Sequence, residues 1–299
     1  MKLSLVDNTL FLDNSALELI STCKRQAELY ILHKREKNAD RPALRFGGII
    51  HKALEALYLN QGKPIQELKG LMLTAITKGF DAWTPEAEEF RNYDCACSFI
   101  SRYLEEYPVE PFTVHSVETS FTVDFGVFTM SDGTEIKVVW QGRIDLIGER
   151  EGKRFFMDHK TTSMMGPTYF KEFDMSSQFR GYAWAMRKLL GEMPTFGWVN
   201  GLGIRKPTKT GKAFEFSRYP VHFVPDQLDE WYLDTQALIA EFLQCAEVGF
   251  FPRQTKWCVG KYGACQYFDV CVLPREHRAT MLASGDFKPV TWDPTKNED

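Results

Sequence analysis

One predicted strand carries side chains of the types and spacing that divalent-metal chemistry needs. Asp158, His159 and Lys160 follow an apolar run in the sequence. Alternate side chains of a strand leave the same face, so the Asp158 carboxylate and the Lys160 ammonium point the same way. A carboxylate can hold a cation, and a lysine beside it can orient a water molecule or stabilise a developing negative charge. A solvated ion pair on an edge strand is the simpler interpretation of this spacing alone.

A second carboxylate, that of Asp145, is expected near Asp158 because a hairpin turn separates the two strands that carry them. If the chain turns between Arg150 and Glu151, Asp145 lies opposite Phe156. Asp158 is then a diagonal neighbour of Asp145 on the same face, roughly 7–8 Å away between Cα atoms. Two carboxylates at that separation can grip one divalent cation.

Three further side chains stand out by their positions. Gln178 and Tyr182 are four residues apart on a predicted helix and therefore share a face. His51 follows two glycines at a helix start, where a backbone can approach another element closely. Neutral imidazole is also a common metal ligand. Each pattern has a simpler interpretation. Gln178 and Tyr182 could belong to a helix surface with one buried tyrosine, and His51 could be an ordinary surface or core histidine.

Taken together and in this order, the residues resemble the PD-(D/E)xK nuclease superfamily, in its RecB-like branch. The matching motifs are G-x-x-H at Gly48 to His51, G-x-x-D at Gly142 to Asp145, D-x-K at Asp158 to Lys160, and Q-x-x-x-Y at Gln178 to Tyr182. The resemblance covers roughly residues 15–275. It implies an α/β fold of the restriction-endonuclease type, with a mixed central sheet flanked by helices. It also implies metal-dependent hydrolysis of DNA phosphodiester bonds.

The resemblance implies a role for each motif residue. His51, Asp145, Asp158 and the main-chain carbonyl of His159 would be metal ligands, Lys160 would orient and activate the water, and Gln178 and Tyr182 would brace the site or the DNA strand. Oxygen ligands suit Mg²⁺ or Mn²⁺, and Mn²⁺ accepts imidazole more readily. Glu118, on the preceding predicted strand, could be another carboxylate near the metal, but a surface glutamate is the simpler account.

Four cysteines are candidates for a second metal centre. Cys258, Cys265 and Cys271 fall within fourteen residues, and Cys23 is the candidate for a fourth ligand. Thiolates at short spacings bind Zn²⁺ or an iron–sulfur cluster. The other cysteines fall in helical patterns as small apolar residues: Cys95, Cys97 and Cys245.

The chain is similar in this respect to the iron–sulfur subgroup of RecB-like nucleases, which includes AddB-type and CRISPR-adaptation exonucleases. In that subgroup one N-terminal and three C-terminal cysteines hold a [4Fe–4S] cluster with a structural role. Six residues separate Cys258 from Cys265 here, where the family often has two. Zn²⁺ therefore stays an alternative to the cluster, and so does the absence of any metal at these cysteines.

The composition excludes two classes of protein. The 299 residues are 44% hydrophobic and 25% charged, which does not fit a wholly disordered chain. The net charge of −4 excludes a strongly basic nucleic-acid coat, so DNA must contact local basic segments. Residues 24–45 hold seven basic against three acidic side chains, and residues 205–212 hold four basic and no acidic ones. Tyr169 and Phe170 could stack on an unpaired base, or be core aromatics.

The sequence predicts a protein without a membrane span, because no run of about 18 apolar residues occurs. It predicts a cytoplasmic one, because acidic residues interrupt the N-terminal stretch where a signal peptide needs an apolar run. The chain lacks the G-x-x-x-x-G-K-[ST] loop of ATP-driven motors, so any helicase or recombination activity would come from a partner protein. The expected function is a DNA exonuclease that acts on single strands or ends in recombination, repair or phage DNA processing. Two alternatives are a CRISPR spacer-processing nuclease and a catalytically silent member that binds DNA or protein.

Periodicity and turn residues predict the elements that must position these side chains. The predicted helices cover residues 15–36, 47–59, 64–81, 85–106, 175–190 and 226–248. The predicted strands cover residues 114–128, 136–148, 154–160, 195–205 and 213–224. We expect a single nuclease domain over 1–285, with a helical lobe at about 15–110, a catalytic core at about 111–250 and a Cys-rich segment at about 251–275. A loose tail is expected over 286–299.

Overall fold

The computed structural model describes residues 6–87, 89–166, 168–208, 211–260, 263–291 and 293. Their internal contacts divide the chain into two compact units. The first unit takes its residues from 1–40, 120–142 and 226–299, and the second consists of 41–119 and 143–225. The single-domain organisation stays a prediction.

A mixed sheet contains six strands in the order β1-β4-β5-β6-β7, with β3 paired to β4. The strands are β1 (Thr9–Leu12), β3 (Thr113–Thr129), β4 (Glu135–Arg150), β5 (Lys153–Thr162), β6 (Phe196–Ile204) and β7 (Phe214–His222). The β1–β4 and β5–β6 pairs are parallel, whereas the β4–β5 and β6–β7 pairs are antiparallel. Helices flank this sheet, which confirms the expected fold class.

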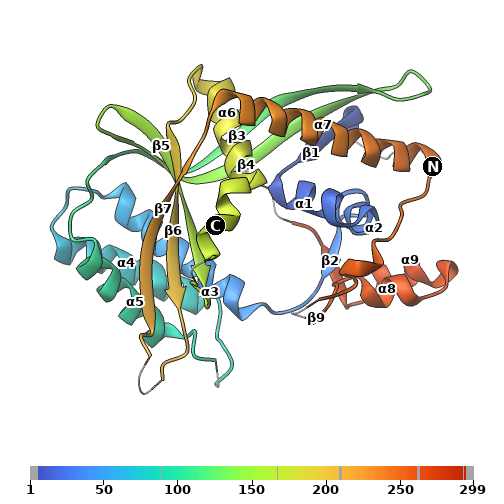
Figure 1. The fold of residues 1–299 in the computed structure, drawn as a ribbon. Coiled ribbons are helices and arrows are strands. Elements are labelled where there is room, and N and C mark those ends of the chain that lie inside the picture. The colour runs from blue at the N-terminus through green and yellow to red at the C-terminus, as the bar shows by residue number, and fades with distance from the viewer. Residues whose placement is uncertain are drawn as a thin grey trace. The chain divides into compact units, whose positions relative to one another are not determined.

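In the second unit, helices pack on both faces of the strands that carry the motifs. Its helices are α3 (Pro42–Leu59), α4 (Ile65–Asp81), α5 (Tyr93–Glu106) and α6 (Ser177–Leu190), with the short 3-10 helix η3 (Tyr169–Met175). Phe155 of β5 joins the core that α3, α4 and α5 cover, and these helices gather beside β6 and β7 in Figure 1. The next residue, Phe156, points to the other face, where its ring lies 5.2 Å from that of Phe179 of α6. β5 is therefore buried on both faces, as its apolar run predicts.

The first unit contains the N-terminal helices and the Cys-rich segment. Its elements include α1 (Asn14–Thr22), α2 (Lys24–Ala27), the π-helical turn η2 (Glu28–Leu32), β2 (Arg35–Lys37), α7 (Pro225–Val248), β8 (Val259–Gly260), β9 (Gly263–Ala264), α8 (Phe268–Val272), α9 (Arg278–Leu282) and β10 (Phe287–Pro289). The first residue of α7, Pro225, belongs to the second unit. The remaining 3-10 turns are η1 (Val6–Asn8), η4 (Thr255–Trp257) and η5 (Arg275–His277). A small core of this unit consists of Leu29, Tyr267, Val270, Leu282 and Phe287.

Three sequence-based expectations need correction. The helix predicted over 15–36 is broken at Cys23, whose extended backbone (φ −160°, ψ 112°) separates α1 from α2. The helix predicted from residue 85 begins only at Tyr93, because the side chain of Asn92 accepts a hydrogen bond from the Cys95 N–H and caps it there. The tail predicted to be loose from 286 includes β10, which pairs antiparallel with β2. Across the residues that the structure describes, no helix has the length and apolar character to cross a membrane.

Candidate active site

The β4–β5 hairpin brings Asp145 and Asp158 together. Its turn consists of Glu151 and Gly152, whose φ values of 53° and 74° are those of a two-residue type I′ turn. The last regular pair at the open end joins Leu146 to Met157, so each aspartate lies one residue beyond it. The expected opposition of Asp145 to Phe156 is therefore wrong by two residues. Because side chains alternate with a period of two, this shift keeps both carboxylates on the same face.

Three side chains from different elements form a group that can hold a metal ion. His51 of α3, Glu118 of β3 and Asp145 of β4 offer donor atoms that all lie within 4.8 Å of one another. The interpretation of Glu118 as a surface glutamate is wrong, since its side chain is only 17% exposed and lies 3.7 Å from the Arg143 guanidinium. Glu118 also has a φ of 46°, which is rare for a residue with a side chain. Such backbone strain concentrates at functional sites.

A close contact between α3 and β5 places His51 in this group. A Cβ atom on Gly47 would lie 2.9 Å from Oγ1 of Thr161, so glycine permits the approach of the helix. His51 lies one turn further on the same face. Its Nδ1 is 3.5 Å from Oδ2 of Asp145.

Burial and crowded carboxylates shift the pKa values of the group. Burial, and then the charge of Asp158, raise the pKa of Asp145 from 3.8 to about 8. Burial, and then the charge of Asp145, raise the pKa of Glu118 from 4.5 to about 7. Burial lowers the pKa of His51, which favours the neutral imidazole that can bind a metal. The oxygen and nitrogen donors fit Mg²⁺ or Mn²⁺, and a cation would relieve the repulsion between the carboxylates.

Hydrogen bonds link the other motif residues into one cluster. The Lys160 ammonium lies 2.8 Å from Oδ2 of Asp158 and donates to Oε1 of Gln178 over 2.8 Å. The Gln178 amide donates to Oδ1 of Asp158 at 3.2 Å and to the Tyr182 hydroxyl at 2.9 Å. Tyr182 in turn donates to the main-chain carbonyl of Arg143 at 2.7 Å. Asp158 is only 2% exposed and β5 lies between two other strands, so the solvated edge ion pair is excluded.

His159 connects this cluster to a second group of polar residues that the sequence did not indicate. Its main-chain N–H donates to Oδ2 of Asp145 at 2.7 Å. Its side chain packs on the opposite face, stacked on Tyr58 with ring centroids 5.7 Å apart and perpendicular to His51 at 5.5 Å. Its Nδ1 lies 2.9 Å from the amide nitrogen of Asn200. Burial lowers the pKa of His159 well below its usual value, which favours the neutral ring.

The four candidate cysteines all belong to the first unit. Burial raises the pKa values of Cys265 and Cys271, and the charges of the other thiolates, Cys23 and Cys258 among them, raise both further. The main-chain N–H of Gln254 donates to the sulfur of Cys23, and that of Tyr267 donates to the sulfur of Cys265, both at 3.4 Å. Donors of this kind stabilise metal-bound thiolates.

The remaining cysteines behave as the sequence indicates. Cys95 and Cys97 of α5 pack against the core of the second unit. Burial raises the pKa values of both thiols. In the described part of the chain all seven cysteines are free thiols.

Many of the basic side chains predicted to contact DNA are paired with acidic ones. Ion pairs join Lys24 to Glu241, Arg25 to Glu28, Lys37 to Asp269 and Arg205 to Glu215. Lys209, which also belongs to the predicted basic segment, lies outside the described residues. These pairs leave fewer available cations than the sequence count indicates.

The two aromatic candidates for base stacking have different surroundings. Phe170 stacks on Tyr219 of β7, with ring centroids 5.4 Å apart, so its ring already has an aromatic partner within the second unit. Tyr169 is half-buried beside the catalytic strand. Its pKa is raised to about 12 by burial, and then by the charges of Glu172 and Asp158.

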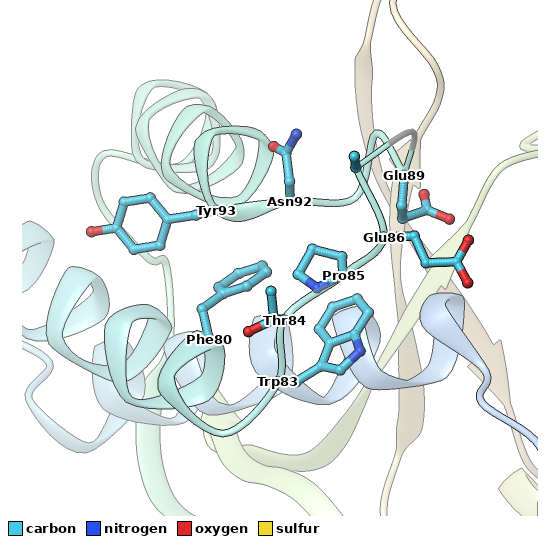
Figure 2. Close-up of a pocket in the computed structure, with 9 residues that line it drawn as sticks. Phe80, Trp83, Thr84, Pro85, Glu86, Glu89, Asn92 and Tyr93 are labelled. Atoms are coloured by element: carbon cyan, nitrogen blue, oxygen red, sulfur yellow. The ribbon is translucent and has the colours of Figure 1, made fainter.

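A separate pocket of about 330 Å³ lies where the chain passes from α4 to α5 (Figure 2). Its lining residues are Phe80, Trp83, Thr84, Pro85, Glu86, Ala87, Glu89, Asn92 and Tyr93. The lining shares no residue with the motifs or with the His51, Glu118 and Asp145 group. This pocket is therefore separate from the group of candidate metal ligands.

Comparison with known proteins gives a family and a fold. A model of the PD-(D/E)XK nuclease superfamily matches residues 14–272. No curated protein matches the chain. A protein of Eubacterium rectale described as a candidate exonuclease has a similar structure, with a TM-score of 0.55 and 14% identity over 92% of this chain and 93% of that chain. The alkaline exonuclease of Laribacter hongkongensis matches at a TM-score of 0.24 and 10% identity over 69% of this chain and 94% of that chain.

Proposed function

The chain belongs to the PD-(D/E)XK nuclease superfamily, and we propose that it is a metal-dependent DNA exonuclease of the RecB-like branch. It hydrolyses phosphodiester bonds on single strands or at DNA ends, in recombination, repair or phage DNA processing. The observation that carries this proposal is the position of the metal-binding group beside the buried Asp158 and its ion pair with Lys160. The E. rectale protein, whose fold the chain shares, is itself described as a candidate exonuclease, which supports action from ends.

His51, Glu118 and Asp145 hold Mg²⁺ or Mn²⁺, and Asp158 and the main-chain carbonyl of His159 add donors from β5. When bound, the cation neutralises charge that builds on the phosphate and lowers the pKa of a coordinated water. Glu118 joins the predicted ligand set because its carboxylate oxygen lies within 4.8 Å of the donor atoms of His51 and Asp145.

Lys160 acts on the water and on the phosphate. Its ammonium is held by Asp158 and by Gln178, both at 2.8 Å, and so points in a set direction without a bound substrate. Gln178 accepts from this ammonium at Oε1, while its amide nitrogen donates to Asp158 and to Tyr182. Tyr182 anchors this arrangement to the backbone of β4 at Arg143. A preorganised cation beside the reacting phosphate is the largest contribution that the side chains alone can make.

Tyr169 contacts the substrate strand next to the bond that is cleaved. The side chain is half-buried and close enough to Asp158 for the two charges to interact. A ring at that point can stack on an unpaired base. Every base has an aromatic face, so this contact does not require a particular DNA sequence.

Cys23, Cys258, Cys265 and Cys271 hold a [4Fe–4S] cluster that joins the α1–α2 junction to the Cys-rich segment. Beyond burial, the charges of Cys23 and Cys258 raise the pKa values of Cys265 and Cys271, so the four sulfur atoms are near one another, which supports a shared metal centre.

The decisive experiment is digestion of single-stranded and duplex DNA labelled separately at the 5′ and 3′ ends. The purified protein should release short labelled products with Mg²⁺ or Mn²⁺ and none with EDTA. Asp158→Ala should abolish this release while the protein stays folded, because it removes a ligand and little core volume. Asp124→Asn is the matched control, since that carboxylate is 63% exposed on β3. Metal-dependent cleavage by the Asp158→Ala protein, or none by the native protein, would contradict the proposal.

A further inference from the structure

A row of polar side chains crosses the sheet behind the catalytic strand. His159 of β5, Asn200 of β6 and Arg218 of β7 are register partners on three adjacent strands, so their side chains share a face. Asn200 is completely buried and His159 is 4% exposed. This face otherwise belongs to the aromatic core under α3 and α5. Burying a polar group costs free energy unless it is hydrogen-bonded, so each of these groups should have a partner. The donor in one hydrogen bond then determines which group must donate in the next.

The direction of the hydrogen bonds can be deduced from the charged end of the row. Arg218 donates to both carboxylate oxygens of Glu110 at 2.6 Å. A carboxylate in this pair only accepts, so the Tyr58 hydroxyl, 2.9 Å away, must donate to it. Tyr58 has one hydroxyl hydrogen, and it is now used. The Tyr103 hydroxyl, 2.7 Å from that of Tyr58, must therefore donate to Tyr58.

The same deduction continues to the catalytic strand. With its hydrogen used, Tyr103 can only accept from Asn200, so the amide nitrogen and not the oxygen faces it at 2.9 Å. That nitrogen also lies 2.9 Å from Nδ1 of His159. Nδ1 must then accept, and the ring proton of His159 is on Nε2. In the deduced amide orientation, one acceptor of Asn200, Oδ1, has no partner among the described residues. The reverse orientation would put the amide nitrogen at that position and leave its two N–H donors without partners.

We propose that Asn200 is a positioning residue that holds His159 as the neutral, Nε2-protonated tautomer. Asn200 acts at the edge of the ring, while Tyr58 stacks on its face and His51 lies perpendicular to it. A held ring keeps the main chain of β5 in place between Asp158 and Lys160, where the His159 N–H binds Asp145. A neutral ring also adds no positive charge beside the group that must attract a cation. This second consequence rests on the proposed nuclease function.

The tautomer can be tested without any nuclease activity. Metal-free protein labelled with ¹⁵N at histidine should give, for His159, one protonated and one unprotonated ring nitrogen, with the proton on Nε2. The assignment is made by the loss of these signals in His159→Phe. A proton on Nδ1, or on both nitrogens at neutral pH, would overturn the proposal whether or not the protein cleaves DNA.

The positioning role can be tested by combining two variants. Asn200→Leu, which keeps the volume, should lower kcat by about tenfold, as loss of partners behind metal ligands typically does, and leave KM for DNA unchanged. In a His159→Phe background the same change should have no further effect on kcat, because Asn200 acts through that ring. An equal loss in both backgrounds would show that Asn200 acts by another route and overturn the proposal.

A control separates positioning from general loss of a buried polar group. Thr235→Val changes a side chain of α7 that is 1% exposed and belongs to the first unit, and it should leave kcat unchanged. If the native protein cleaves no DNA with either metal, the proposed function fails, and the ¹⁵N measurement still decides the tautomer.

Discussion

The main-chain N–H of His159 donates to Oδ2 of Asp145 over 2.7 Å, although the regular pairing of β4 with β5 ends at Leu146 and Met157. A backbone donor thus holds one carboxylate against the strand that carries the other, Asp158. The pKa of Asp145 is about 8 in the metal-free protein, so this hydrogen bond becomes charge-assisted, and about twice as strong as a neutral one, when a bound cation ionises the carboxylate. This contact keeps the two carboxylates close in spite of their repulsion, which prepares the site for a cation.

Glu118 should be a metal ligand, so Glu118→Gln should weaken Mn²⁺ binding by at least about tenfold and remove most of the cleavage. The substitution keeps the size of the side chain but not its charge. Isothermal titration with Mn²⁺ measures the affinity. Glu149→Gln, at a carboxylate of β4 whose side chain is 43% exposed, should bind Mn²⁺ like the native protein. Native affinity in the Glu118 variant would return this residue to a structural role.

Lys160→Ala should separate catalysis from metal binding. Turnover should fall at least about a hundredfold, the range typical of a lost group that handles protons or charge in the transition state. Mn²⁺ affinity should persist, because the ammonium acts on the water and phosphate and not on the cation. Lys63→Ala, on an exposed lysine paired with Glu67, is the control. Parallel loss of affinity and turnover in Lys160→Ala would show that the assigned role is wrong.

The raised pKa of Asp145 predicts how the stability of the metal-free protein depends on pH. Because the folded-state pKa, about 8, exceeds the usual 3.8, the folded protein holds this proton more tightly than the unfolded chain. The stabilising contribution is complete below about pH 4 and is lost as the pH rises through about 8. Asp145→Asn removes this loss, so it should raise the melting temperature in EDTA more near pH 8 than near pH 5. Asp124→Asn should show no such difference, and an equal gain at both pH values would contradict the shift.

Gly47 and Gly48 should differ sharply when changed to alanine. Gly47→Ala places a Cβ atom 2.9 Å from Oγ1 of Thr161, which should push α3 away from β5 and cost about 1–3 kcal/mol of unfolding free energy. The same displacement should move His51 and weaken Mn²⁺ binding. Gly48→Ala meets no atom within 4 Å and should leave both quantities unchanged or slightly improved. Urea unfolding and Mn²⁺ titration of the two variants decide this, and equal behaviour would contradict the contact.

Cys23, Cys258, Cys265 and Cys271 should behave as one unit. Protein purified without oxygen should be brown, absorb near about 400 nm and contain about four irons per chain. Serine at any of the four should bleach or destabilise it, because three thiolates hold a cluster poorly. Serine at Cys95, Cys97 or Cys245 should not remove the colour. Colourless protein with stoichiometric zinc would replace the cluster by a zinc site and leave the nuclease proposal intact.

The sequence by itself determined the features that depend on neighbours along the chain. The two-residue period of β5 put Asp158 and Lys160 on one face, and the four-residue spacing of Gln178 and Tyr182 put both on one side of α6. The five predicted strands and the helices over 64–81, 175–190 and 226–248 end within two residues of the observed ends. Local sterics and hydrogen bonding dictate these features, so a short window of sequence contains the information.

Only the tertiary structure decided which distant residues meet. Glu118 has no local pattern that distinguishes it from a surface glutamate, and its role emerges when β3 carries it to His51 and Asp145. The hairpin register depended on Glu151 taking a positive φ, which a non-glycine residue seldom does. The hydrogen bonds that lead from Glu110 to His159 join residues far apart in the sequence. Arg218 and Glu110, for example, are 108 positions apart. Such contacts arise from packing between elements, because burial obliges each polar group to find a partner wherever the fold provides one.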